Sequence, residues 1–450
     1  MTPAPFPVES LQGDRDRTAK AETLTDDSAL DDVRVLDISG EIGLYCTKLL
    51  ADLGADVIKV EPPEGHPGRR SGPFYHDEIN PEKSLCFFNL TTSQRSITLN
   101  LENCDGRALF KQLAATADVV VESFPPGHLD SLGLGYRHLC EIRPDIILAS
   151  ITGFGQWGPH SRYQWCDLVG LAMSGVMWLA GEPDDPPNRV YGNQGYISAS
   201  IQAASGILMA LYHRDVAGEG QQVDVSMQEA LALAQETAAQ TWDMQKVLRR
   251  RIGAWRVPML QVPGIGNYAC KDGYVFCYLG TPGGAPWPVM LEWMIEEGEA
   301  QDLAEEPYLS LIQELGLPLI TQSLADAEAV ERLADPLARI HEVLSEFLAK
   351  RTKVEIYDEA QKRRLLIGMV STPKDLVEDA QLNYRGYFQD VAHPELGETL
   401  RYPGPPVHLS ATPWRIRRRP PLLGEHNAAV YGELGICPDE LLTLKGAGVI

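Results

Sequence analysis

Three successive strand–helix–strand patterns in the first 151 residues constrain the fold of this chain more than any other feature. The stretch VRVLDIS (33–39) is apolar and β-branched, LYCTKLLADLG (44–54) has helical spacing and ends at a glycine, and ADVIKVE (55–61) is a second strand. The same alternation returns with DVVVESF (118–124) and DIILASI (145–151), each after a helical stretch. Repeated units of this kind predict an α/β fold with a mostly parallel, doubly wound sheet, whose ligands bind beyond the carboxyl ends of its strands.

The rest of the chain divides by composition. Residues 1–32 are polar and of mixed charge and lack the apolar stretch of a secretory signal, which predicts a disordered lead-in. Residues 33–254 hold the alternating strands and helices of the expected large domain. Glycine- and proline-rich short strands followed by acidic helical patterns predict a smaller α+β domain over 255–385. Residues 386–450 are proline-rich and extended before a short terminal helix, so we expect them to return to the large domain.

The charge balance excludes several classes of partner. The chain has 39 basic and 62 acidic residues and a net charge of −23, which repels phosphate backbones and anionic membrane surfaces. We therefore expect no nucleic-acid partner and no membrane partner. The longest apolar run, residues 168–181, is also too short to span a bilayer.

Cysteine and histidine usage argues against metal and disulfide sites. Eight cysteines are scattered without a CxxC pair, and the histidines are not clustered. Neither a zinc site nor a disulfide framework is expected from this pattern. Most of the cysteines lie in apolar or helical context, so we expect buried free thiols in a reducing cytoplasm.

One glycine-rich stretch imitates a nucleotide-binding motif. GFGQWG (153–158) follows a strand and fits the G-x-G-x-x-G pattern. Pro159 follows at once, however, and the next residues do not continue as a helix whose N-terminus could hold a pyrophosphate. We interpret the stretch as a glycine turn and expect no dinucleotide cofactor.

Several stretches together resemble the class III CoA-transferase family, namely LLADLGADVIKVEPP, ADVVVESFPPGHLDSLGLGY, ILASITGFGQWGP and GILMALYHRDVAGEGQQVDVSM. That family includes formyl-CoA and carnitine CoA-transferases and the 2-methylacyl-CoA racemases, and the resemblance covers about residues 33–450 in order. It implies a Rossmann-like large domain built from both chain ends, a smaller α+β domain between them, and two chains interlocked like linked rings. It also implies an acyl-CoA and a carboxylic acid as substrates, with no separate cofactor.

The resemblance puts a tyrosine where the transferases have their nucleophile. In the family an aspartate attacks the thioester and forms first a mixed anhydride and then an enzyme thioester. It stands just before the helix that reads GIL here, and carrying that position over from Gly206 gives Tyr196. Residues 186–214 contain no acidic residue. A tyrosine phenol ordinarily titrates near pH 10 and could form only an aryl ester, which does not support that cycle.

Other family positions depart in the same direction. Ile42 and Tyr45 stand where the family often has a glutamine or similar residue, and Pro62 and Ser131 stand where cations are usual. Those cations would meet the CoA phosphates, so their loss weakens the expected binding. Phe124 matches the family and could pack on the adenine or pantetheine of CoA, or else serve as a core aromatic at a strand end.

The racemase branch of the family uses a histidine directly before an aspartate, together with the later acid. This chain has Cys166 before Asp167, and the later acid is replaced by Tyr196. Asp167 is therefore the one carboxylate on a family active-site position. Its alternative interpretation is an acid that caps a helix starting at Leu168.

Three hypotheses for function follow. The first is a subunit of an acyl-CoA:carboxylate CoA-transferase whose nucleophilic aspartate comes from a paralogous partner chain. The resemblance supports it, because the succinyl-CoA:benzylsuccinate CoA-transferases of anaerobic aromatic-hydrocarbon breakdown are heteromers of this type. The second is a stand-alone CoA-transferase or 2-methylacyl-CoA racemase that uses Asp167. The third is a regulatory or scaffolding protein without an acyl-CoA role.

Overall fold

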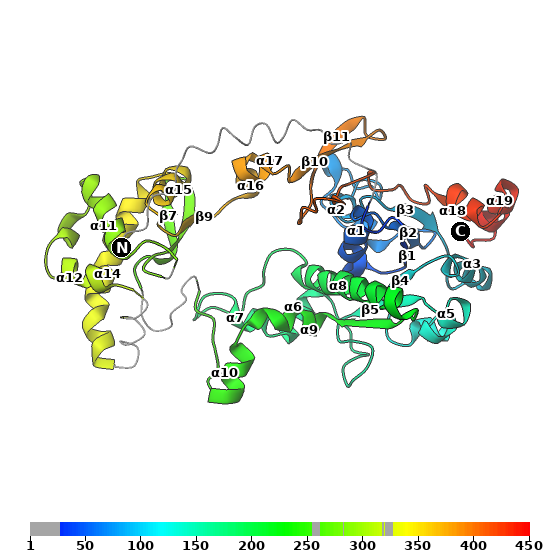
Figure 1. Ribbon diagram of the computed structural model, residues 1–450, viewed down its shortest axis with the longest axis horizontal. Coiled ribbons are helices and arrows are strands. Elements are labelled where there is room, and N and C mark those ends of the chain that lie inside the picture. The colour runs from blue at the N-terminus through cyan, green and yellow to red at the C-terminus, as the bar shows by residue number, and fades with distance from the viewer. Residues whose placement is uncertain (1–27, 254–261, 282, 317–318, 320–326) are drawn as a thin grey trace. The chain divides into compact units, whose positions relative to one another are not determined.

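The computed structural model describes residues 28–253, 262–281, 283–316, 319 and 327–450 (Figure 1). The chain separates into two compact units, of which the first comprises Met1–Gln164, Tyr196–Ala230 and Gly386–Ile450. The second unit comprises Trp165–Gly195 and Leu231–Arg385. The first unit is therefore built from both ends of the chain.

The division differs from the boundary expected between residues 254 and 255. The second unit also takes in Trp165–Gly195 and the residues that follow Leu231, which the sequence analysis assigned to the large domain. Periodicity along the chain finds elements, but it does not find the distant segments against which they pack. The expected lead-in lies outside the described residues as far as residue 27.

The first unit contains a six-stranded sheet in which every pair of neighbouring strands is parallel. The spatial order is β3-β2-β1-β4-β5-β6, so the direction of winding reverses between β1 and β4. The strands are β1 (Arg34–Asp37), β2 (Asp56–Glu61), β3 (Arg95–Thr98), β4 (Val119–Glu122), β5 (Ile147–Thr152) and β6 (Gln222–Ser226). The prediction of an α/β fold with a parallel, doubly wound sheet is confirmed.

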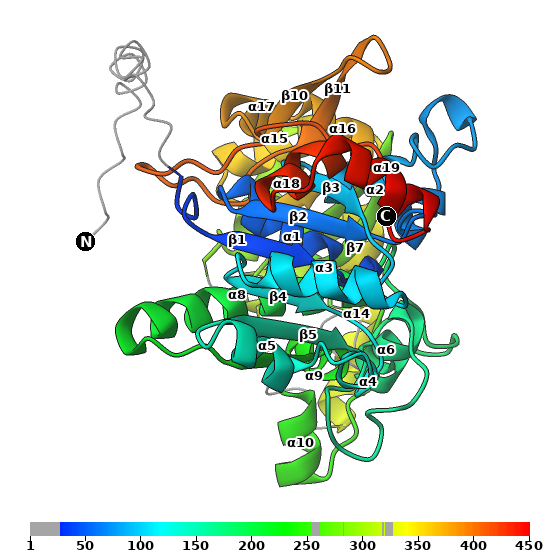
Figure 2. The same ribbon diagram turned by 90° about the vertical axis from the view of Figure 1, so that its right-hand side faces the viewer.

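Helices cover both faces of this sheet (Figures 1 and 2). Figure 2 looks onto one face, where α3, α5 and α18 bury apolar side chains against a core that includes Leu36, Val120 and Leu148. On the other face lie α1 and α8, and Gly206 of α8 comes so close to Val223 that a β-carbon would not fit. The helices of this unit are α1 (Leu44–Asp52), α2 (Leu85–Leu90), α3 (Cys104–Ala114), α4 (His128–Ser131), α5 (Tyr136–Ile142), α8 (Gln194–Ala217), α18 (Asn427–Glu433) and α19 (Pro438–Gly446).

The C-terminal segment packs against β3 and the residues that follow it. It begins with the antiparallel hairpin β10 (Phe388–His393) and β11 (Glu398–Pro403). Further on, the Tyr431 hydroxyl donates to the Thr98 carbonyl (2.7 Å), and the Asn100 amide donates to the Val449 carbonyl (2.8 Å). These bonds hold the end of the chain along β3 and its following turn.

The second unit is mostly helical around a small antiparallel sheet of order β7-β8-β9. Its strands and helices are β7 (Ile265–Cys270), β8 (Gly273–Tyr278), β9 (Ile367–Met369), α6 (Asp167–Met173), α7 (Val176–Leu179), α10 (Ala238–Gln245), α11 (Trp287–Glu296), α12 (Tyr308–Glu314), α14 (Ala327–Ala349), α15 (Lys353–Lys362), α16 (Pro373–Glu378) and α17 (Ala380–Tyr384). Between the units in sequence lies α9 (Met227–Ala232). In the core, Trp293 and Phe347 meet edge to face with ring centroids 5.0 Å apart.

Replacing Phe347 by alanine tests this core. The ring is 1 % exposed, and Phe347→Ala should lower the free energy of unfolding by about 3–5 kcal/mol because it leaves a cavity beside Trp293. The matched control is Val354→Ala on the exposed side of α15, expected to change stability by less than about 0.5 kcal/mol. Urea unfolding followed by tryptophan fluorescence measures both variants. A Phe347→Ala protein as stable as the control would contradict the packing.

Candidate functional site

The loops that follow β1 and β4 meet at the point where the winding of the sheet reverses. Ligands of doubly wound sheets bind in the crevice at such a point, beyond the carboxyl ends of the strands. The Gly40 amide after β1 donates to the Ser123 hydroxyl after β4, at 2.7 Å. Room for a side chain is limited, since a β-carbon on Gly40 would lie 3.3 Å from that hydroxyl. The two loops are thus fixed to each other at the expected ligand crevice.

A buried ion pair joins β1 to β2 next to this point. Lys59 and Asp37 are both fully buried, and their charged groups lie 3.0 Å apart. The same ammonium donates to the Ser39 carbonyl at 3.0 Å, and the Thr47 hydroxyl donates to the Asp37 carboxylate at 2.7 Å. Each buried charge has several partners, which is the condition under which burial of charge is tolerated.

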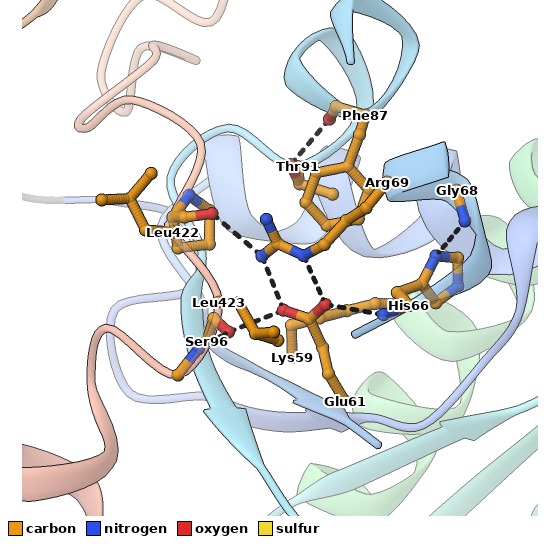
Figure 3. Close-up of polar contacts among 12 residues, drawn as sticks. Lys59, Glu61, His66, Gly68, Arg69, Phe87, Thr91, Ser96, Leu422 and Leu423 are labelled. Carbon is orange, nitrogen blue, oxygen red and sulfur yellow. Dashed lines mark hydrogen bonds and ion pairs between the residues drawn. The ribbon is translucent and has the colours of Figure 1, made fainter. Parts of the chain in front are cut away.

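A second buried cluster joins β2 to the C-terminal segment (Figure 3). Two nitrogens of Arg69 bind the two oxygens of Glu61 at 2.6 and 2.7 Å, and the guanidinium also donates to the Pro421 carbonyl at 3.0 Å. It lies over the Phe87 ring, 4.2 Å from the centroid. Burial alone would raise the pKa of Glu61, but Arg69 and the Ser96 hydroxyl hold that pKa below its usual range.

His66 belongs to the same cluster and is neutral. Its Nδ1 accepts from the Gly68 amide at 2.9 Å, and its Nε2 lies 3.2 Å from the Ser39 carbonyl, so Nε2 carries the proton. Burial, with the nearby Lys59 charge, holds the pKa of His66 well below its usual range. The buried cations Lys59 and Arg69 are therefore both engaged by buried carboxylates. The sequence analysis had not identified Arg69, because a histidine–proline–glycine stretch before two arginines resembles an exposed loop.

Phe124 lies in the loop after β4 and packs at the edge of the core between the sheet and α3. Its ring lies tilted against the His128 imidazole at a centroid distance of 4.8 Å. The core-aromatic interpretation is supported by this packing, and the half-buried ring also presents a surface beside the crevice. Ser131, at a position where the family has a cation, is exposed and donates its hydroxyl to the His128 carbonyl at 2.6 Å.

Tyr196 occupies the first turn of α8 and is half-buried. One turn further along the same helix face, the Ser200 hydroxyl donates to the Ile42 carbonyl at 2.5 Å. This bond attaches the first half of α8 to the short helix η2 (Glu41–Gly43) after β1. The structure therefore brings the face that carries Tyr196 toward the β1 loop, where Ile42 is buried and Tyr45 is half-buried.

Asp167 lies in the second unit, whereas Phe124 and Tyr196 lie in the first. It is the first residue of α6 and is buried, and Cys166 before it is the N-cap residue without a side-chain cap bond. The helix therefore starts at Asp167 and not at Leu168, and its cap residue is Cys166 and not Asp167. The Asp167 carboxylate stands in the first turn, where the helix dipole favours negative charge.

Glu122 is a buried acidic residue of the site that was not singled out from the sequence. It ends β4, is 4 % exposed, and accepts a hydrogen bond from the Phe124 amide at 2.7 Å. Burial raises the pKa of Glu122 to about 7, with smaller contributions from Asp224 and Asp130, although the Ser150 hydroxyl and the Phe124 amide act in the opposite direction. The signal in the sequence was a carboxylate inside the apolar run DVVVESF, at a position that alternation turns to the same side as Val120.

A cavity of about 150 Å³ adjoins Glu122. Its walls include Pro125 and Gly127 from the loop after β4, Tyr136 from α5, and Ser150 from β5. Beside the cavity lies the glycine turn over residues 153–158, in which the Gln156 amide donates a hydrogen bond to the Asp224 carboxylate at 3.0 Å. The backbone of this turn is thus bonded to a carboxylate of β6.

The structure describes all eight cysteines, and each is a free thiol. The expectation of buried thiols is wrong for Cys86, Cys104, Cys166 and Cys437, which are exposed. Three of these four stand at helix starts, where side chains face water. Within the described ranges no group of three or more histidine, cysteine and acidic side chains is placed to hold a metal ion, and no helix there is long and apolar enough to cross a membrane.

Comparison with known proteins identifies the family. The model of CoA-transferase family III matches residues 30–427. This chain belongs to that family.

Individual relatives cover nearly the whole chain. It is 33 % identical over 419 residues to the succinyl-CoA:(R)-benzylsuccinate CoA-transferase subunit BbsE of Thauera aromatica, covering 93 % of this chain and 97 % of the relative. It is 34 % identical over 426 residues to a formyl-CoA:oxalate CoA-transferase of Streptomyces avermitilis, covering 94 % and 99 %. The crystal structure of a CaiB/BaiF family protein from Brucella suis superposes with a TM-score of 0.75 at 27 % identity, covering 90 % and 99 %.

Removing the Glu122 charge tests its burial. Because the native state keeps the Glu122 proton up to about pH 7 and an ordinary carboxyl loses it near 4.5, native stability falls as pH rises between these values. Glu122→Gln should therefore match the natural protein at pH 5 and be more stable at pH 8, by on the order of 2 kcal/mol. The exposed Glu219→Gln serves as control. Urea unfolding at both pH values measures the difference, and an equal effect at pH 5 and pH 8 would contradict it.

Proposed function

We propose that this chain is a subunit of a heteromeric acyl-CoA:carboxylate CoA-transferase, in which a paralogous partner chain supplies the nucleophilic aspartate. The observation that carries the proposal is Tyr196 at the start of α8, with no acidic residue from 186 to 214. A tyrosine there can fill the space beside α8, but it cannot form the mixed anhydride with an acyl group. We further propose that the two chains interlock like linked rings.

The acyl-CoA role is supported by the crevice between the loops after β1 and β4. Doubly wound sheets bind their ligands there, and the half-buried Phe124 ring offers an apolar surface beside it. The two buried cations next to the crevice, however, are paired with buried carboxylates, as Lys59–Asp37 and Arg69–Glu61. A CoA phosphate would gain little from them, so we propose that this chain binds CoA more weakly than its partner chain does.

The name of one relative supports a subunit role. One similar protein is a subunit of a benzylsuccinate CoA-transferase, and another of almost equal identity is a formyl-CoA:oxalate CoA-transferase. The benzylsuccinate relative extends the proposal to a role in aromatic-compound breakdown. The partners would be the paralogous chain, an acyl-CoA and a carboxylic acid.

A second candidate function rests on Asp167. This carboxylate is buried in the first turn of α6, a favourable place for an ionised acid. A stand-alone CoA-transferase could use it as nucleophile, and a 2-methylacyl-CoA racemase could use it as the single base. The partner-subunit proposal accounts for Tyr196, Pro62 and Ser131 together, and for this reason we favour it.

The full chain alone should form no acyl-enzyme, because it lacks a carboxylate at the nucleophile position. The test is incubation with succinyl-CoA, treatment with hydroxylamine or borohydride, and intact-mass measurement of any modified carboxylate. The partner chain that carries the aspartate is the positive control. A stoichiometric adduct on any residue of this chain would refute the proposal.

Asp167→Asn in the assembled enzyme should lower activity about tenfold, because the carboxylate shapes a pocket without covalent chemistry. The exposed Asp184→Asn in the same unit is the control and should leave activity unchanged. Steady-state CoA transfer measures both variants. A loss of about a millionfold would instead show that Asp167 is the nucleophile or base.

A further inference from the structure

Three polar side chains stand abreast on the face of the sheet that α3 and α5 cover. The strand register pairs Glu122 of β4 with Ser150 of β5, and Ser150 with Asp224 of β6. The row before it on β4 and β5 is apolar, with Val120 paired to Leu148. Strands covered on both faces are usually apolar throughout, and a buried carboxyl costs free energy unless it is bonded. The position of Glu122 therefore needs a specific explanation.

The loop after β4 supplies one. Glu122 accepts the hydrogen bond of the Phe124 amide at 2.7 Å, two residues further along the chain. Beyond Phe124 the loop lies over the cavity of about 150 Å³, with Pro125 and Gly127 in its wall. A β-carbon on Gly127 would meet no atom within 4 Å. Phe124 packs on the edge of the core, but the loop is open to the cavity at Pro125 and Gly127, so the hydrogen bonds at its start contribute to its position.

The same start of the loop is joined to the turn after β1. The Ser123 hydroxyl, between Glu122 and Phe124, accepts the Gly40 amide at 2.7 Å. A movement at residues 122–124 therefore changes both walls of the crevice. Among the residues that form these two hydrogen bonds, Glu122 is the one with an ionisable side chain.

We propose that Glu122 is a positioning residue whose ionised carboxylate anchors the loop carrying Phe124, so that protonation of Glu122 weakens acyl-CoA binding by this chain. The effect on acyl-CoA rests on the proposed function, whereas the anchoring of the loop does not. A hydrogen bond to a carboxylate is stronger than one to a neutral carboxyl group, which gives the direction of the effect.

Charged groups from three elements face this site. Asp224 from β6 and Asp130 from α4 oppose the ionisation of Glu122, and Arg137 from α5 lines the cavity. The pKa of Glu122 near 7 places its proton loss in the physiological range. The His128 imidazole lies tilted against the Phe124 ring, with 4.8 Å between the ring centroids, and is itself a titratable group. Any test must therefore separate Glu122 from His128.

The anchor is tested by a fluorine label on the loop. We would place 4-trifluoromethylphenylalanine at position 124 of the full chain and record its ¹⁹F resonance from pH 5.5 to 8.5 without CoA. A shift with a midpoint near 7 that is absent in Glu122→Gln supports the anchor, because His128 is present in both proteins. Asp130→Asn should keep the titration and move its midpoint to lower pH, because one opposing charge is gone. Identical titrations of the natural chain and Glu122→Gln would overturn the anchor.

The consequence for binding is tested by calorimetric titration with CoA at pH 6 and pH 8. The natural chain should bind about three- to tenfold more weakly at pH 6, and Glu122→Gln should lose that difference. The phosphates of CoA also titrate, but they affect both proteins equally and cancel in the comparison. Equal pH dependence of the two proteins would overturn control of binding by Glu122. No CoA binding at either pH would overturn an acyl-CoA site in this chain, while the fluorine titration still decides the anchor.

Discussion

The buried ion pair between Lys59 and Asp37 is the interaction on which the crevice of the first unit depends. It joins the carboxyl ends of β1 and β2 and holds the Ser39 carbonyl, from which the β1 loop starts. Removing one partner of such a pair leaves an unpaired buried charge and typically costs about 3–5 kcal/mol. The Glu61–Arg69 cluster extends the same principle to the C-terminal segment. Lys59 and Arg69 thereby hold the loops in place and are not left for the phosphates of a ligand.

The sheet could be predicted from the sequence, because its signals are local. The apolar, β-branched runs at 33–39, 55–61, 118–124 and 145–151 each contain a strand of the parallel sheet. The assignment of Trp165–Gly195 to the second unit could not be predicted, because it depends on contacts between distant residues, such as the bond from Trp178 to the Arg249 carbonyl 71 positions later. Cys166, likewise, is exposed because α6 begins directly after it, and apolar context alone does not show this.

The candidate site was only partly predictable. Tyr196 and Phe124 were identified through the family resemblance, and the structure places both in the first unit. Glu122 was missed because its importance arises from the strand register, which puts it beside Ser150, and from the cavity next to it. Arg69 was missed because its partner Glu61 lies eight residues earlier and its second partner, Pro421, near the other end of the chain. Such pairings are absent from any local pattern.

The proposed function makes CoA transfer depend on a partner chain, because Tyr196 stands where the family resemblance places the nucleophile. The most direct measurement is co-expression of this chain with its paralogue, followed by native mass spectrometry and an assay of CoA transfer. We expect a stoichiometric complex that is active with Tyr196 in place and inactive when the paralogue's aspartate is replaced by asparagine. A homodimer of this chain that transfers CoA unaided would contradict the partner-subunit function and direct attention to Asp167.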